Sequence, residues 1–174
     1  GHLGHGAITA NGNLGFGLIH ASFINSLQPE RVLVIGSKQG YIPAICGLAC
    51  KAIKKGKVDF VDAGYGAEDD NNWGGTSFWK DNDPDEHFSI WELNKYIDTY
   101  VMTSAQYAKK FPKRKYQYIY VDGDHSYEGV KKDYRLFWPK LASGGFMVFH
   151  DIKTKGTHHD VEFGVWKFWN ELKI

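Results

Sequence analysis

Short apolar runs recur along the chain and alternate with segments whose apolar residues have helical spacing. This alternation predicts an α/β fold, in which helices cross over between the parallel strands of one sheet. The expected strands span residues 31–35, 57–62, 97–103, 116–121 and 146–149, and the expected helices span residues 16–28, 42–56, 89–95, 105–111, 127–137 and 161–172. We therefore expect a doubly wound, mostly parallel sheet with helices on both faces.

Composition excludes several classes of protein. The length of 174 residues corresponds to about one domain, and a hydrophobic content of 43% is enough for a packed core. A net charge of +1 without a long basic run argues against a nucleic-acid partner. No apolar stretch is long enough to span a bilayer, so we expect no membrane association. Two cysteines do not make a disulfide framework and no secretory signal is visible, so we expect a cytoplasmic protein.

Two segments depart from the regular alternation. Residues 1–15 are rich in glycine and predict a flexible N-terminal segment. Residues 63–91 contain many Gly, Asp and Asn residues, together with Trp73, Phe78 and Trp79. A stretch of this length is either a functional lid or a disordered insert, and its large aromatic side chains argue against disorder. We expect a single domain over residues 1–174 with a lid-like insert at 63–91.

A glycine loop, Gly36 to Gly40, follows the first expected strand at the edge where parallel sheets bind ligands. Its glycines allow a sharp turn and a close approach of the backbone to a ligand, and the next helix start offers free amides. Asp62 ends the second strand, at the position that holds a ribose in nucleotide-binding βαβ units. An ordinary strand-to-helix turn would also explain the glycine loop, and a solvated strand end would also explain Asp62. Both interpretations stay open.

Acidic and imidazole side chains follow the last two expected strands. Asp122, Asp124 and His125 come after the fourth strand, and His150 and Asp151 come after the fifth. Because adjacent strands lie about 5 Å apart, Asp122 and Asp151 can share a divalent ion, with His150 as a ligand or close neighbour. His125 can act as a base on a substrate hydroxyl, because its unperturbed pKa is about 6.5. The alternative is that the acids cap the next helix and the histidines lie on the surface.

Three stretches resemble the class I S-adenosylmethionine-dependent methyltransferases. More narrowly, they are similar to the macrolide-sugar O-methyltransferases and the cephalosporin hydroxylase-like proteins. The stretches are Val32–Gly40, Tyr118–Tyr127 and Gly144–Ile152, and Gly164–Leu172 adds to the likeness. The resemblance implies a Rossmann-like methyltransferase fold that here lacks the last two strands of the family's sheet.

The resemblance also implies roles for the candidate site residues. In that family the glycine loop holds the methionine part of the cofactor, the acid after the second strand holds its ribose, and the loop after the third strand lies beside its adenine. The implied cofactor-binding residues are Gly36, Ser37, Gly40, Asp62, Ser104 and Asp122. The acids after the fourth and fifth strands bind metal in metal-dependent members, which implies metal ligation by Asp122 and Asp151, with His150 beside them. The motif histidine is the family's proposed base, which implies catalysis by His125.

These expectations lead to a prediction of function. The chain is expected to use S-adenosylmethionine and a divalent metal, with Mg²⁺ as the first choice, to methylate a hydroxyl of a sugar, a glycan or another small polyhydroxylated molecule. Two other classes stay open: a metal-dependent hydrolase or phosphoesterase, and a cofactor-binding domain without catalysis. The glycine spacing disfavours an NAD-dependent oxidoreductase. A small-molecule or glycan acceptor is the expected partner, and assembly as a homo-oligomer is left open.

Overall fold

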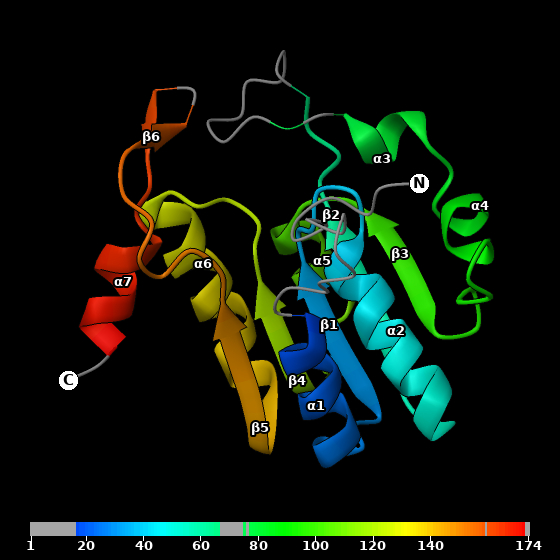
Figure 1. Cartoon of the computed structure of the whole chain (residues 1–174). Coiled ribbons are helices and arrows are strands. Elements are labelled where there is room, and N and C mark those ends of the chain that lie inside the picture. Colours follow the sequence, from blue (N-terminus) through cyan, green and yellow to red (C-terminus); the bar gives the residue numbers. More distant parts are fainter. Residues whose placement is uncertain (1–16, 67–74, 76, 159, 173–174) are drawn as a thin grey trace.

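One parallel sheet organises the chain (Figure 1). The computed structural model describes residues 17–66, 75, 77–158 and 160–172. The strands of the sheet are β1 (Arg31–Ile35), β2 (Lys57–Asp62), β3 (Ile97–Val101), β4 (Tyr116–Val121) and β5 (Leu141–Phe149). Their order is β3-β2-β1-β4-β5, and every adjacent pair is parallel. Strand order therefore reverses between β1 and β4, where an open α/β sheet forms a crevice for ligands.

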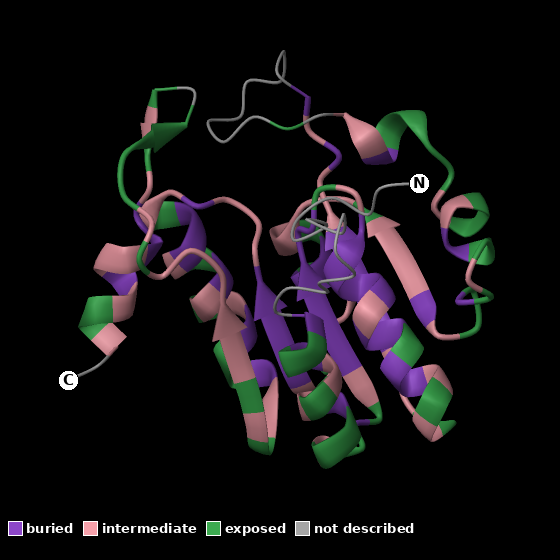
Figure 2. Cartoon of the chain, viewed as in Figure 1, coloured by how far each residue is buried: buried purple, intermediate pink, exposed green. Residues whose placement is uncertain are grey.

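Helices cover both faces of this sheet because successive strand residues point to opposite sides. The covering helices are α1 (Gly17–Leu27), α2 (Tyr41–Ile53), α5 (Ser104–Lys110), α6 (Tyr127–Phe137) and α7 (Val165–Leu172). Val32 and Val34 of β1 pack in one core with α1 and α2, which lie in front of the sheet in Figure 1. Leu33 and Ile35 pack in a second core with α5, α6 and α7. Figure 2 shows that the central strands are largely buried, which confirms the doubly wound arrangement.

The expected insert contains two short helices, α3 (Phe78–Asp81) and α4 (Pro84–Ser89). The prediction of a helix over residues 89–95 is wrong, because the helix begins earlier, at Pro84. The Asp83 carboxylate accepts hydrogen bonds from the amides of Asp85 and Glu86, and proline is well suited to the first helical turn. The expected flexible segment at 1–15 and residues 67–74 of the insert lie outside the described residues.

The C-terminal part also differs from the sequence-based expectation. β5 begins at Leu141, directly after a 3₁₀-helix (Trp138–Lys140), and not at Phe146. The segment expected to be a polar loop contains an antiparallel pair of strands, β6 (Thr157–His158) and β7 (Val161–Glu162). α7 begins at Val165, after this hairpin, and not at residue 161. Such short strands carry too little apolar periodicity to be recognised from sequence.

No helix in the described part of the chain is long and apolar enough to cross a membrane.

Candidate active site

A cavity of about 500 Å³ lies beyond the carboxyl ends of the strands. Most of the predicted site residues line it: Gly36, Ser37, Asp62, Ser104, Asp122, His125 and Asp151. Among the described residues, Gly40 and His150 were predicted for the site but are not part of the cavity wall. Loops that are distant in sequence therefore meet at one edge of the sheet, as expected for the strand-order reversal between β1 and β4.

The glycine loop after β1 is held by backbone contacts on both sides. Gly36 has a φ of +70°, and a Cβ placed on it would lie 2.2 Å from the carbonyl oxygen of Asp122. Only glycine therefore lets the loops after β1 and β4 approach this closely. The Ser37 hydroxyl accepts a hydrogen bond of 3.2 Å from the amide of Ile42, in the first turn of α2. Gly40 faces the insert instead of the cavity, because a Cβ there would lie 2.9 Å from the Phe88 ring.

Asp62 ends β2 and places its carboxylate on the cavity wall. Its Oδ1 accepts a hydrogen bond of 2.8 Å from the amide of Gly64. Burial raises the pKa of Asp62, the amides of Gly64 and Ser37 partly offset this effect, and the charge of Asp122 adds to it. The carboxylate is thus anchored to the two neighbouring loops at the position predicted for a ribose contact.

Ser104, at the start of α5, is paired with a carboxylate that sequence reasoning missed. Its hydroxyl donates a hydrogen bond of 2.6 Å to Asp133 Oδ1, and Asp133 also lines the cavity. Burial raises the pKa of Asp133 to about 6, although the bond from Ser104 opposes the shift. A signal was present in the sequence, because Asp133 lies at helical spacing between the buried Val130 and Phe137. An acid within an apolar helical stripe is a candidate functional group, because burying an unpaired charge is costly.

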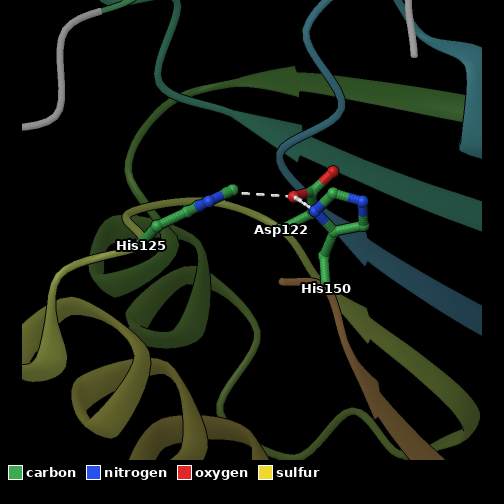
Figure 3. Close-up of side chains that lie close together, drawn as sticks. All are labelled: Asp122, His125 and His150. Atoms are coloured by element: carbon green, nitrogen blue, oxygen red, sulfur yellow. Dashed lines mark ion pairs between the residues drawn. The ribbon is translucent and has the colours of Figure 1, made fainter. Parts of the chain in front are cut away.

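Asp122, His125, His150 and Asp151 form one compact cluster at the ends of β4 and β5. Figure 3 shows the first three of these side chains. Asp122 Oδ1 lies 2.9 Å from His125 Nε2 and 3.1 Å from His150 Nδ1. Asp151 lies on the other side, with 3.0 Å from its Oδ2 to His125 Nδ1 and 3.3 Å from its Oδ1 to His150 Nδ1. Two carboxylates therefore enclose two imidazoles, and the alternative of separate surface histidines is excluded.

The charges in this cluster stabilise one another. Burial alone would lower the pKa of both histidines, but the contacts with Asp122 and Asp151 raise that of His125 to about 9 and that of His150 to about 10. Burial alone would raise the pKa of the two acids, but the imidazoles hold the pKa of Asp122 and of Asp151 below its ordinary value. The contacts within the cluster thus favour the charged form of each of the four groups.

Potential metal ligands lie close together in this cluster. Asp122, His150 and Asp151 were predicted as the ligand set, with His125 as a base. One potential ligand atom from each of Asp122, His125 and His150 lies within 4.8 Å of the other two, which makes these three the set that the structure brings together. Asp151 lies next to both imidazoles and is not a member of that set.

Aromatic side chains and the C-terminal hairpin complete the cavity wall. Tyr65, Phe78 and Trp79 line it from the insert, and His158 and Phe163 line it from the region of β6 and β7. The described part of the insert therefore contributes to the cavity wall. The hairpin's contribution was missed, because the segment was expected to be an open polar loop.

The sequence matches a known protein family. A family described as a methyltransferase domain matches residues 33–152. An uncharacterized protein of Sinorhizobium fredii is 26% identical to this chain in an alignment that covers 97% of the chain and 17% of that protein. The chain thus spans about a sixth of the length of that curated relative.

Solved structures with the same fold are more distant in sequence. A putative O-methyltransferase from Klebsiella pneumoniae has a TM-score of 0.68 at 15% identity, over 98% of this chain and 71% of that chain. An O-methyltransferase of tomaymycin synthesis from Streptomyces achromogenes, solved in complex with S-adenosylmethionine, has a TM-score of 0.66 at 12% identity, over 93% of this chain and 71% of that chain. At these identities the likeness establishes a shared fold.

Proposed function

Because this chain belongs to the methyltransferase-domain family, we propose that it transfers the methyl group of S-adenosylmethionine to a hydroxyl of a small polyhydroxylated acceptor such as a sugar or glycan. One observation carries the proposal. A single cavity contains both the glycine loop with Asp62 and the cluster of Asp122, His125 and Asp151. A methyl donor and its acceptor can therefore bind side by side, as a direct transfer requires.

The end of the cavity near β1 and β2 would hold the donor. Gly36 and Ser37 line the cavity, and Ser37 keeps their loop attached to the start of α2. Asp62 would accept hydrogen bonds from the ribose hydroxyls, because its carboxylate is already fixed by Gly64. Ser104 would lie beside the adenine, as the family resemblance implies for the loop after the third strand, and Asp133 would hold the Ser104 hydroxyl.

The end near β4 and β5 would hold the acceptor. When bound, S-adenosylmethionine supplies an electrophilic methyl group on sulfur, so the S–CH₃ bond breaks as the O–CH₃ bond forms. The protein must orient the hydroxyl and remove its proton, leaving a methyl ether and S-adenosylhomocysteine as products. Asp122 and Asp151 would attract a divalent ion to this end, where such an ion lowers the pKa of an acceptor hydroxyl.

His125 is the residue predicted to take the hydroxyl proton, and the structure sets a condition on that role. Both of its ring nitrogens face carboxylates, and its pKa is raised to about 9. A protonated imidazole cannot accept a proton, so His125 must first lose one. That loss requires either alkaline pH or a cation bound beside Asp122.

The cavity wall offers two kinds of surface to an acceptor. Tyr65, Phe78 and Trp79 present aromatic surface, which suits the apolar face of a sugar ring. Asp122, His125 and Asp151 present charged groups, which suit hydroxyls. A polyhydroxylated ring uses both kinds of surface at once.

Calorimetry with S-adenosylhomocysteine tests the proposal directly. We expect binding of one S-adenosylhomocysteine per chain, and we expect release of this product when S-adenosylmethionine is supplied with a sugar or glycan acceptor. Nucleoside binding without turnover on a broad acceptor panel would indicate a cofactor-binding domain. Cleavage of a phosphoester without any nucleoside affinity would indicate the hydrolase and would contradict the proposal.

A further inference from the structure

We propose that Asp122, His125 and His150 form a binding site for a divalent transition-metal ion such as Mn²⁺, Fe²⁺, Co²⁺ or Zn²⁺, in place of the Mg²⁺ predicted from the sequence. The inference rests on the proposed function, because the ion would act on the acceptor hydroxyl of that reaction. It deepens that function by naming the class of metal. The site itself is defined by the contacts of its own side chains.

The donor atoms do not fit Mg²⁺. This ion prefers oxygen ligands in near-ideal octahedral geometry and retains several of its waters. The three residues that the structure groups supply one carboxylate oxygen and two imidazole nitrogens. Imidazole suits first-row transition ions, and a set of two histidines and one carboxylate is typical of sites for Fe²⁺ and related ions.

The spacing of the donor atoms agrees with such an ion. Asp122 Oδ1 lies 2.9 Å from His125 Nε2 and 3.1 Å from His150 Nδ1. Two bonds of about 2.1 Å at a right angle separate their ligand atoms by about 3.0 Å. The side chains therefore already lie at the spacing of adjacent ligands, which Figure 3 shows as two short contacts meeting at one carboxylate oxygen.

Asp122 presents this oxygen in a way that a cation would satisfy. Its side chain is 4% exposed, and Oδ1 lies 2.9 Å from His125 Nε2 and 3.1 Å from His150 Nδ1. Its other oxygen, Oδ2, accepts a hydrogen bond of 3.4 Å from the hydroxyl of Tyr120, which is buried. Tyr120 thus holds one oxygen in place and leaves the other directed at the two imidazoles.

Asp151 supplies the outer partner that metal-bound histidines usually have. Its Oδ2 lies 3.0 Å from His125 Nδ1, the nitrogen that stays protonated when Nε2 binds a metal. A carboxylate at that position fixes the ring orientation and increases the basicity of the ligand. Asp151, predicted as a ligand, is by this inference a positioning residue, and it is held in turn by the hydroxyl of Thr154 at 2.9 Å.

The inference changes the role of His125. A nitrogen bound to a metal cannot also take the proton of the acceptor hydroxyl. If His125 is a ligand, its substitution should weaken metal binding. If His125 is only a base, its substitution should leave metal binding intact.

Metal titration of tag-free, chelator-treated protein tests the assignment. We expect one Co²⁺ per chain, followed through its visible absorption, with an affinity at least about 100-fold higher than that for Mg²⁺ in competition. In the Mn²⁺-loaded protein, pulsed electron paramagnetic resonance should detect couplings to two imidazole nitrogens. Equal affinity for Mg²⁺, or a Mn²⁺ spectrum without nitrogen coupling, would overturn the inference.

Single substitutions identify the ligands. His125→Gln and His150→Gln should each remove one nitrogen coupling, and Asp151→Asn should weaken Co²⁺ binding by roughly 10- to 100-fold while both couplings remain. His87→Gln is the matched control, because His87 on α4 lies outside both the cluster and the cavity wall, and its replacement should leave Co²⁺ binding unchanged. Retention of both couplings in His125→Gln would show that His125 is not a ligand and would contradict the assignment.

Failure of this inference and failure of the proposed function are distinguishable. S-adenosylhomocysteine binding, measured on the same samples, reports on the methyltransferase function and confirms that each variant is folded. Nucleoside binding without transition-metal binding would contradict only the metal site. Transition-metal binding without nucleoside binding would support the metal site and contradict the proposed function.

Discussion

Asp62 is the residue on which recognition of the donor should depend most. Its carboxylate lies on the cavity wall and is oriented by the Gly64 amide at 2.8 Å. Hydrogen bonds to a charged group contribute about 1.5–3 kcal/mol each. We expect Asp62→Asn to bind S-adenosylhomocysteine roughly 10- to 100-fold more weakly by calorimetry, because the amide keeps the Gly64 contact but loses the charge.

Asp98 on the neighbouring strand provides the matched control for Asp62. Asp98 lies on β3 outside the cavity wall and pairs with Lys57 at 2.6 Å. Asp98→Asn should leave the affinity unchanged. Equal affinities of the wild type and of Asp62→Asn would contradict the ribose assignment.

Asp133 should make stability depend on pH in an unusual direction. Its pKa is raised from 3.8 to about 6 by burial, so the folded state holds this proton more tightly than the unfolded state. The resulting stabilisation is complete below about pH 4 and is lost as the pH rises through about 6. The groups that act on Asp133 are Ser104 from α5, Asp124 from the loop after β4 and Lys132 from α6.

Asp133→Asn removes this titration and keeps an acceptor for Ser104. Between pH 4 and pH 7 we expect the free energy of unfolding of the wild type to fall relative to the variant by about 2–3 kcal/mol, from about 1.4 kcal/mol per pKa unit. Urea denaturation at several pH values measures the difference. Parallel pH profiles of the two proteins would show that Asp133 is not protonated in this range.

At the scale of elements, the close approach of the loops after β1 and β4 depends on Gly36. A Cβ on Gly36 would lie 2.2 Å from the Asp122 carbonyl oxygen, and the residue also has a φ of +70°. Gly36→Ala should therefore combine backbone strain with a clash, lower the free energy of unfolding by more than about 2 kcal/mol and impair nucleoside binding.

Gly144 separates the effect of backbone strain from the effect of a steric clash. Its φ is +75°, but nothing lies within 4 Å of the position of its Cβ. Gly144→Ala should lower stability by only about 1–2 kcal/mol and leave binding intact. If both alanine variants lose equal stability in thermal unfolding, the close approach of the loops is not what requires Gly36.

A buried ion-pair cluster around Asp59 joins β1 and β2 to the loop before β4. Asp59 of β2 is fully buried and contacts Arg31 at 2.8 Å, Arg114 at 3.0 Å and the Tyr107 hydroxyl at 2.7 Å. Asp59→Asn leaves two arginines without their shared partner and should cost about 3 kcal/mol in urea denaturation. Asp98, its register partner on β3, forms a half-exposed pair, so Asp98→Asn should cost less than about 1 kcal/mol. A similar loss in both variants would mean that burial of Asp59 has no special energetic role.

At the scale of the whole molecule, the cavity is lined by parts of the chain that are far apart in sequence. Its wall includes the ends of β1 and β2, the start of α5, the insert and the hairpin region. A ligand there should stabilise the fold as a unit. At 100 times its dissociation constant, S-adenosylhomocysteine adds about 2.7 kcal/mol, which corresponds to a rise in Tm of about 5–10 °C.

This rise is measured by thermal unfolding with and without the ligand. Asp62→Asn at the same ligand concentration should show a smaller rise. A Tm that stays constant at saturating ligand would contradict binding in this cavity. The class of acceptor and a cytoplasmic location stay predictions from the sequence.

Local patterns along the sequence were sufficient to predict the layers and the edge that carries the site. The alternation of strand-like and helix-like periodicity predicted the five parallel strands, and the polar residues after each strand predicted that Asp62, Asp122, His125 and Asp151 would share one edge. These features follow from side-chain direction and strand polarity, which act over a few residues. Because the hairpin at β6 and β7 has two-residue strands, the same kind of reasoning missed it.

Distances between side chains were decided only by the tertiary structure. The sequence could not show that His125 approaches Asp122 within 2.9 Å while Asp151 faces its other nitrogen, that Asp133 pairs with Ser104, or that Gly40 turns toward the insert. Each of these contacts depends on how helices and loops far apart in the chain pack against one another. Packing at that precision is a property of the complete core, whereas periodicity is a property of a single segment.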